Sequence, residues 1–309
     1  MTTELKLDRP DLDKAYAMCK AIAKSKAKNF YYAFVALPVP RRNAICAIYA
    51  FMRKADDLAD EDETLPREER LRRLDDWLAG WRSFCQGGET TDPVFIALRD
   101  ATDRFAIPLS LLDELVAGVT LDLKPASSNS PDAYATFADL YVYCYGVASV
   151  VGLACIRIFG YKDSGAEKLA EETGIAFQLT NILRDVAEDA ERNRIYLPLE
   201  NLNAHGIPLE DFLHRTPGAP PTPAERALLA EIAGRAEGYY QSALALVPLI
   251  DRECRPAMWV LVSIYHRLLE RIRRADYDVF SRRISVPRVQ KLGILAIGQA
   301  RMAMARLFV

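Results

Sequence analysis

The segment QLTNILRDVAED, residues 178–189, places polar side chains on one face of an otherwise apolar helical pattern. Asp185 and Asp189 share that face, because four residues complete about one helical turn. Asn181 lies one turn before Asp185, and Gln178 lies two turns before it. Carboxylates in such apolar surroundings need a compensating cation, which Lys, Arg or Mg²⁺ can provide. The segment therefore predicts a helix with a polar face that holds a cation.

A second acidic pair occurs earlier in the chain, in the segment MRKADDLADE at residues 52–61. Asp56 and Asp60 lie one helical turn apart, whereas Asp57 points about 100° away from them. One such pair alone is typical of a solvated helix surface. Two pairs, one of them accompanied by Asn181, favour a site in which carboxylate and amide oxygens hold Mg²⁺ against phosphate groups.

Around these segments, apolar residues recur every three or four positions, which is the period of an amphipathic helix. One such run consists of Leu71, Leu74, Trp77, Leu78, Trp81 and Phe84. Turn-forming residues interrupt the pattern at residues 37–40, 86–88, 124–131 and 216–223. No alternating run of β-branched residues is long enough to found a sheet. We expect an all-α fold of about ten helices, organised as one domain over residues 1–309.

The composition excludes several classes of protein. Half of the 309 residues are hydrophobic and 27% are charged, which excludes a disordered chain. Forty Lys and Arg against 42 Asp and Glu give a net charge of -2, so we expect no nucleic-acid partner. The six cysteines and three histidines lack the spacing of a zinc site or a disulfide framework. The N-terminal segment lacks the apolar core of a signal peptide, and we expect a cytoplasmic protein.

Contact with a membrane is the alternative at one end of the chain. No segment reaches the roughly 18 uninterrupted apolar residues that a membrane span requires. Residues 147–156 come nearest, but they contain several small residues and predict a tightly packed core helix. Residues 289–309 are apolar with Lys291, Arg301 and Arg306 at roughly helical spacing. They predict a helix that packs one face on the protein, with a membrane surface as the other possibility.

Several segments in a fixed order resemble the squalene and phytoene synthases. They are NFYYAFVALP (29–38), RR (41–42), AIYAF (47–51), RKADDLAD (53–60), YCYGVASVVG (143–152), QLTNILRDVAED (178–189) and NRIYLP (193–198). The resemblance extends from about residue 15 to residue 290. It implies an isoprenoid-synthase helical bundle around a central apolar cavity. It also implies a transferase that joins two allylic isoprenyl diphosphates head to head, through a cyclopropylcarbinyl diphosphate.

The resemblance also implies roles for individual residues. The Mg²⁺ ligands would be Asp56, Asp60, Asn181, Asp185 and Asp189. Contacts with the diphosphates or with the polar part of the cavity would come from Arg53, Tyr143, Gln178, Arg184, Arg194, Tyr265 and Arg282. These residue types suit the chemistry, because Mg²⁺ and arginine can neutralise the departing diphosphate without a nucleophilic base beside the allylic cation. Tyr143 would help to orient charge.

One segment departs from the family pattern. Relatives often carry Ser or Thr, and sometimes His, shortly before Phe30, where they help to hold a diphosphate. This chain has Ala27 there, and only the neighbouring Lys26 and Asn29 could meet phosphate oxygens. Ala27 cannot hold the first diphosphate through its side chain, and the departure leaves the expected reaction class unchanged.

The length of the substrate decides the product. We expect two farnesyl diphosphates, giving presqualene diphosphate and then squalene or a similar C30 product, because Phe34 and the pair Phe51–Met52 would shorten a tail cavity. Completing squalene requires hydride from NADPH, although no GxGxxG segment lies in a strand–turn–helix context. The alternative is phytoene from two geranylgeranyl diphosphates, as in carotenoid rather than hopanoid biosynthesis. A terpene cyclase, which acts on one substrate, is disfavoured by the paired segments 53–60 and 178–189, and a non-catalytic interaction protein is disfavoured because both aspartate motifs are intact.

Overall fold

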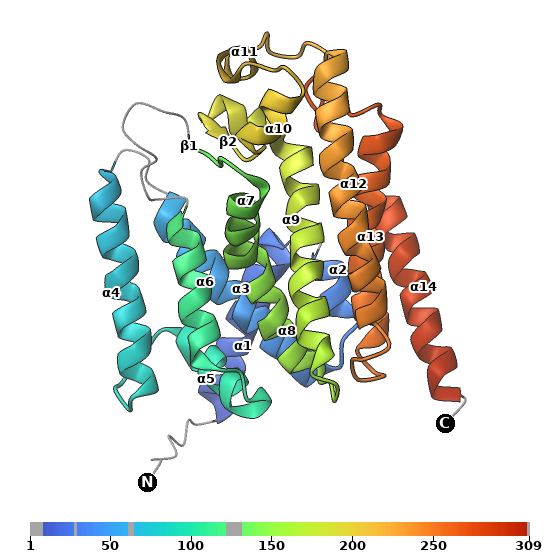
Figure 1. The fold of residues 1–309 in the computed structure, drawn as a ribbon. Helices are drawn as coiled ribbons and strands as arrows, with labels where there is room; N and C mark the ends of the chain where they lie inside the picture. The colour runs from blue at the N-terminus through green and yellow to red at the C-terminus, as the bar shows by residue number, and fades with distance from the viewer. Residues whose placement is uncertain (1–8, 28–29, 61–64, 122–131, 308–309) are drawn as a thin grey trace.

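The computed structural model describes residues 9–27, 30–60, 65–121 and 132–307 (Figure 1). At residues 9–10, 60, 132 and 302–307 the description covers the backbone alone. Its α-helices are α1 (Arg9–Lys26), α2 (Phe30–Val35), α3 (Val39–Asp60), α4 (Arg67–Cys85), α5 (Pro93–Phe105), α6 (Leu109–Leu121), α7 (Phe137–Cys144), α8 (Val150–Phe159), α9 (Gly165–Glu191), α10 (Leu199–Ala204), α11 (Leu209–Leu213), α12 (Pro223–Leu246), α13 (Arg255–Arg274) and α14 (Arg288–Leu307).

The predicted all-α fold is confirmed. Strands in the described chain are limited to β1 (Asp132–Ala133) and β2 (Arg194–Ile195), which pair in parallel. The predicted break at residues 86–88 falls between helices, and those at 37–40 and 216–223 fall at helix ends, since α3 begins at Val39 and α12 at Pro223; 124–131 lies outside the described residues. The expected ten helices were too few for the described chain, which has fourteen. Several of these are too short for a periodic apolar pattern, such as α10 and α11 with six and five residues.

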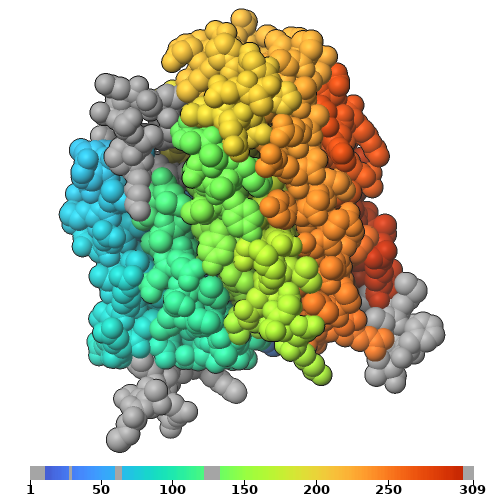
Figure 2. Space-filling view, in the orientation of Figure 1, coloured from blue at the N-terminus to red at the C-terminus, as the bar shows by residue number. Residues whose placement is uncertain are grey.

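Two helices organise the bundle. The 27-residue α9 packs along α12 on one side and along α8 on the other, whereas α3 contacts α1, α4, α5, α6 and α8. Figure 1 shows α9 in the middle of the molecule, with α4 and α14 at opposite edges. The short helices α10 and α11 lie over the end of the bundle at which α9 ends and α12 begins (Figure 2). The segments that carry the two acidic motifs are therefore central elements of the fold.

The side of α3 that faces α4 is filled by aromatic rings. The Phe51 ring is tilted against those of Trp77 and Trp81, with centroids 4.6 Å and 5.7 Å away, and Phe95 completes the cluster. Burying such rings supplies a large share of the hydrophobic stabilisation of a core. Phe51 therefore anchors α3 from outside and does not narrow a tail cavity.

One continuous helix is long and apolar enough to cross a membrane by length and composition. It runs from Phe137 to Phe159, where the π-helical turn η1 (Tyr145–Ser149) joins α7 to α8. This corrects the expectation that no segment qualifies, which rested on uninterrupted apolar residues. In the structure this helix packs between α6 and α9, as predicted for a core helix at residues 147–156 (Figure 1).

Candidate active site

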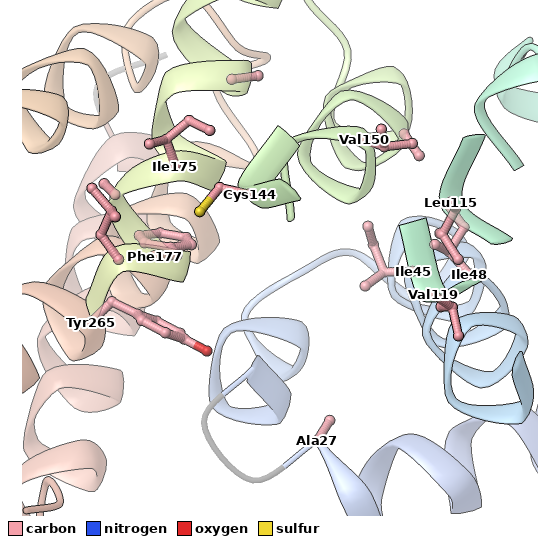
Figure 3. Close-up of a cluster of buried hydrophobic side chains, with 14 of the residues drawn as sticks. Ala27, Ile45, Ile48, Leu115, Val119, Cys144, Val150, Ile175, Phe177 and Tyr265 are labelled. Carbon is pink, nitrogen blue, oxygen red and sulfur yellow. The ribbon is translucent and has the colours of Figure 1, made fainter. Parts of the chain in front are cut away.

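A cavity of about 300 Å³ lies inside the bundle. Its walls are mostly aliphatic and aromatic side chains from α2, α3, α6, α8, α9 and α13. Figure 3 shows Ile45, Ile48, Leu115 and Val119 together on one side of this region, and Phe177 on α9 across from them. The predicted central apolar cavity is thus present, and it is built from residues that are far apart in the sequence.

Helices α3 and α9 each give the cavity one continuous stripe. Residues at steps of three and four share one face of a helix. The stripe on α3 is Ile45, Ile48, Tyr49, Met52 and Asp56, and the stripe on α9 is Ala170, Thr173, Gly174, Phe177, Gln178 and Asn181. Polar side chains come last in both stripes, toward the C-terminal ends of the helices. The predicted residues Asp60, Asp185 and Asp189 continue the same stripes by steps of four.

Four predicted site residues line the cavity: Asp56, Tyr143, Gln178 and Asn181. The amide of Asn181 donates to Gln178 Oε1 at 3.4 Å. Asn181 Oδ1 is buried and accepts no hydrogen bond from the described residues. An amide oxygen without a donor is costly to bury, so this atom is suited to meet a cation or a polar ligand.

Asp185 lies one turn beyond Asn181 and is paired with two arginines. Arg184 Nε donates to Asp185 Oδ1 at 2.7 Å, and Arg283 Nη2 lies 2.9 Å from the same oxygen. Arg283 also contacts Glu188. Burial lowers the pKa of Arg184, but the hydrogen bond and charge of Asp185 more than offset this, and the pKa is raised. The Arg184 guanidinium therefore remains charged at neutral pH.

Arg283 is a residue that the sequence prediction missed. The family pattern pointed to Arg282, which is exposed and borders a separate pocket beside Arg271. The two arginines are adjacent in an irregular segment after α13, where neighbouring side chains can point in different directions. The ion pair with Asp185 is the observation that distinguishes them, and no signal in the sequence indicated it.

The predicted contacts on α3 are only partly described. Arg53 contacts Asp57, one turn along the helix. Asp57 is the aspartate that the helical spacing places about 100° away from Asp56 and Asp60. Asp60 is the last residue of α3, and its side chain lies outside the described residues. Asn29, a predicted phosphate contact, also lies outside them, whereas Lys26 is exposed at the end of α1.

Two predicted tyrosines form part of stacked aromatic groups. Tyr143 lies with its ring centroid 4.9 Å from that of Tyr196, and Tyr265 stacks at 4.4 Å on Phe177 (Figure 3 shows Phe177 and Tyr265). Burial raises the pKa of Tyr265. Both rings are therefore packed. Tyr143 lines the cavity, and Tyr265 lies behind its wall against Phe177.

Asp189 and Arg194 lie apart from the described cavity lining. Both border a separate hollow of about 10 Å³, together with Phe212 and residues of β2. Arg194 is in register with Asp132 of β1. The helix rises about 1.5 Å per residue, so the backbone of Asp189 lies about 12 Å beyond that of Asn181. The structure therefore brings Asp189 to the end of the α9 stripe and not to the cavity itself.

A metal site formed by several acidic side chains is not assembled within the described residues. No three His, Cys, Asp or Glu side chains among them are close enough to hold one ion. The oxygen donors on α3 and α9 nevertheless suit Mg²⁺, which prefers carboxylate and amide oxygens. A cation at Asp185 would have to compete with the two arginines for its oxygens.

The apolar wall contains few groups that could act as a base. Burial raises the pKa of the Tyr49 hydroxyl to about 12 and that of the Cys155 thiol to about 12. Both groups stay protonated at neutral pH, and Asp56 is the one acidic side chain in the described lining. The aromatic side chains of Phe30, Phe34 and Phe177 line the same space. Such a wall can stabilise a carbocation and exclude water without attacking it.

Close backbone contacts fix the helix that carries Tyr143. A Cβ atom on Gly118 would lie 2.4 Å from the carbonyl oxygen of Gly146, and one on Gly174 would lie 2.5 Å from Ser149 Cα. Both contacts fall on η1, the π-helical turn, and such turns often occur at functional sites. The glycines in YCYGVASVVG and in α9 thus allow helices to approach closely beside the cavity.

Comparisons with known proteins agree with this arrangement. A family model described as squalene/phytoene synthase matches residues 23–290. The phytoene synthase of Mycobacterium bovis is 36% identical over 292 residues, which cover 94% of this chain and 92% of that protein. The phytoene synthase of Arthrospira platensis is 33% identical and covers 93% of each chain. Among solved structures, a dehydrosqualene synthase in complex with ligand superposes with a TM-score of 0.82 at 30% identity, covering 96% of this chain and 99% of that chain.

Proposed function

Because the chain belongs to the squalene/phytoene synthase family and condenses isoprenyl diphosphates head to head, we propose that its substrates are two geranylgeranyl diphosphates and its product is phytoene. The names of the similar curated proteins support this alternative over the C30 product expected from the sequence. The position of Phe51 also supports the longer substrate. Of the three residues expected to shorten the tail cavity, Phe34 and Met52 line it, whereas the ring of Phe51 packs against Trp77 outside it.

The observation that carries the proposal is that both cavity stripes change from apolar to polar side chains toward the C-terminal ends of their helices. Polar side chains come last on both α3 and α9, and the rest of the wall is apolar. A substrate with a charged head and a long hydrocarbon tail has the same distribution of polarity. In this proposal both diphosphates lie near Asp56 and Asn181, and both tails extend along the apolar wall.

The arginines near the polar end would bind the diphosphates. Guanidinium groups hold phosphate oxygens through paired hydrogen bonds and keep their charge at any physiological pH. Arg53, Arg184 and Arg283 each lie on or against one of the two acidic helices. On binding a diphosphate, Arg184 and Arg283 would exchange part of their contact with Asp185 for phosphate oxygens.

The oxygen donors would hold Mg²⁺. The proposed ligands are Asp56, Asp60, Asp185 and Asp189 with the amide oxygen of Asn181, and they would hold more than one ion, because Asn181 and Asp189 lie about 12 Å apart along α9. The unpartnered Asn181 Oδ1 supports the assignment of that residue. When bound, Mg²⁺ neutralises negative charge on the departing diphosphate. Phytoene is completed by loss of a proton and not by addition of hydride, so the proposal requires no NADPH.

The remaining residues would protect the cation that ionisation leaves. Tyr49 and Cys155 stay protonated, so neither offers an anion to the cation. The rings of Phe34 and Phe177 present their faces or edges to the cavity and can stabilise positive charge. Tyr143, stacked on Tyr196, would orient the diphosphate end of the substrate.

The test is to incubate the purified protein and Mg²⁺ with either geranylgeranyl or farnesyl diphosphate and to identify the hydrocarbon by mass spectrometry. We expect a C40 product from the C20 substrate. A C30 product formed from farnesyl diphosphate alone would overturn the chain-length assignment, and a monocyclic product from one diphosphate would indicate a cyclase.

Variants test the assigned residues. Asp56→Asn and Asp185→Asn should each lower kcat at least about 100-fold, because each removes charge that positions the cation. Glu191→Gln is the matched control, since Glu191 is exposed at the end of α9 and outside the site. Full activity in both aspartate variants would refute the assignment, and circular dichroism would show whether each variant is folded.

A further inference from the structure

The outer face of α14 is apolar, although it is turned away from the rest of the protein. Gly298 marks the buried side of this helix, and at about 100° per residue the opposite side can be assigned by position. The residues that form this outer face are Val289, Leu292, Gly293, Ala296, Ile297 and Ala300. All six are exposed, and Val289, Leu292 and Ile297 are 80%, 54% and 52% accessible. We propose that the outer face docks the protein on an anionic lipid surface.

The inner side of α14 is packed, which fixes the direction of the outer face. A Cβ atom on Gly298 would lie 2.4 Å from Val260 Cγ2, so α14 lies very close to α13 there. Ile294, one turn earlier, packs against a buried cluster of Ala33, Val260 and Ile264 from α2 and α13. A helix on the surface of a soluble protein normally turns apolar side chains to the protein and polar ones to water. Packing on the protein therefore explains the inner side of α14 and leaves the outer face without a partner.

Basic side chains lie along the edges of the outer face. At about 100° per residue, Arg288 and Arg301 fall on opposite flanks, between the packed side and the outer face. The Arg301 guanidinium lies 4.1 Å from the ring centroid of Trp259 on α13, and Lys291 Nζ lies 5.9 Å from that of Tyr32 on α2. No Asp or Glu occurs in α14. Cations beside an apolar face match lipid phosphates above acyl chains, and half-buried Trp and Tyr rings suit the same boundary.

The charges of α14 argue against a second copy of this chain as the occupant. An interface with two-fold symmetry pairs the same surface of both copies. Because α14 has no acidic residue, pairing two outer faces would bring Arg288 and Arg301 close to cations of the other copy. Anionic headgroups supply the missing negative charge. A lipid surface therefore fits both the apolar face and its basic edges.

The lipid surface would lie close to the wall of the cavity. Helix α14 contacts α2, and α2 contributes Phe30, Ala33 and Phe34 to the cavity lining. Figure 1 shows α14 along one edge of the bundle, with α13 on its inner side. A long hydrocarbon made in the cavity would thus form near an apolar phase that dissolves it, a link that rests on the proposed function. Docking itself does not depend on the substrate.

The test compares two matched pairs of substitutions at exposed apolar positions. Val289→Gln with Leu292→Gln alters the outer face. Val142→Gln with Leu244→Gln makes the same changes on α7 and α12, where the two side chains are 65% and 55% accessible. Flotation with phosphatidylcholine vesicles, with or without phosphatidylglycerol, measures docking, and circular dichroism shows whether each variant is folded. Sedimentation velocity without lipid measures the oligomeric state.

We expect the unaltered protein to float with vesicles that contain phosphatidylglycerol and to bind them more weakly at high salt. The outer-face pair should weaken this binding about tenfold or more, and the control pair should leave it nearly unchanged. No flotation of the unaltered protein, or an equal loss in both pairs, would overturn the proposal. A dimer of the unaltered protein that the outer-face pair dissociates would also overturn it, in favour of a second copy. Val289→Gln alone, at the most exposed of these positions, keeps the test valid if the double variant fails to fold.

Turnover of isoprenyl diphosphates kept in solution by detergent separates this proposal from the proposed function. The substituted residues lie outside the described cavity lining, so both pairs should keep the kcat of the unaltered protein. Loss of flotation with full turnover in the outer-face pair supports docking through α14. An unaltered protein that binds vesicles but turns over no isoprenyl diphosphate would support docking and refute the proposed function.

Discussion

Replacement of Gly174 by Ala should separate two helices that form the wall of the cavity. The new Cβ atom would lie 2.5 Å from Ser149 Cα and 2.7 Å from Ser149 N, both backbone atoms of η1. Ser149 Oγ also donates to the carbonyl of Glu171 at 2.7 Å, which holds η1 against α9. Neither backbone can yield alone, so η1 must move away from α9.

The magnitude follows from a matched glycine. Gly234 lies inside α12, it is exposed, and no atom lies within 4 Å of the place that an alanine methyl group would take there. Alanine is favoured over glycine inside a helix by about 1 kcal/mol, so Gly234→Ala should stabilise the protein by about that amount. The same gain applies at Gly174, but overpacking there costs about 1–3 kcal/mol. The two variants should therefore differ by about 1–3 kcal/mol in their free energy of unfolding, or by about 1.5–4.5 °C in Tm for a chain of 309 residues.

Urea unfolding followed by circular dichroism measures this difference, and steady-state kinetics measure its effect on the site. Val147 and Ala148 of η1 line the cavity, so Gly174→Ala should also raise KM, whereas Gly234→Ala should not. If both variants were stabilised equally and had the same KM as the unaltered protein, the close contact of α9 with η1 would be refuted.

Three further predictions concern packing, protonation and helix capping. Arg41→Met should lower the free energy of unfolding by about 2–4 kcal/mol in urea, because Arg41 donates to the Ile158 carbonyl at 3.0 Å and pairs with Asp251 at 2.8 Å. Burial raises the pKa of the Cys46 thiol from 9.0 to about 11. The buried thiol therefore contributes fully to stability below pH 9, and this contribution is lost as the pH rises from 9 through 11. Between pH 9 and 11 the free energy of unfolding of Cys46→Ala should fall less than that of the unaltered protein. Thr222 accepts a hydrogen bond at 3.2 Å from the backbone N–H three residues on, so Thr222→Ala should lower Tm, at a cost of about 1 kcal/mol, and an unchanged Tm would contradict the cap.

The sequence predicted the helices well because their apolar period is local information. The segments around Asp56 and Asn181 were predicted as helices with one polar face, and both stripes line one cavity in the structure. Which face of α3 turns inward could not be predicted in the same way. Phe51 points outward because Trp77 and Trp81 of α4 pack against it, and no local pattern links α4 to α3.

The choice between Arg282 and Arg283 was beyond sequence reasoning for a similar reason. Both lie in an irregular segment, where no period defines a face. Arg283 is distinguished only by a tertiary contact, its ion pair with Asp185 on a helix almost a hundred residues earlier. The role of Arg282 that the family resemblance implies stays a prediction, and the ion pair adds Arg283 as a candidate beside it.

The near-neutral total charge conceals a local balance that depends on burial. The side chains of Asp185 and Arg184 are 19% and 17% accessible, so breaking their pair would leave a poorly solvated charge. Arg283 is 51% accessible, and its pair with Asp185 is screened by water and therefore weaker. Of the two partners of Asp185, Arg283 can thus be exchanged for another cation at the lower cost. In the proposed function, the same accessibility would let its guanidinium turn to phosphate oxygens, so the residue that leaves Asp185 most easily would also be the one to receive the diphosphate.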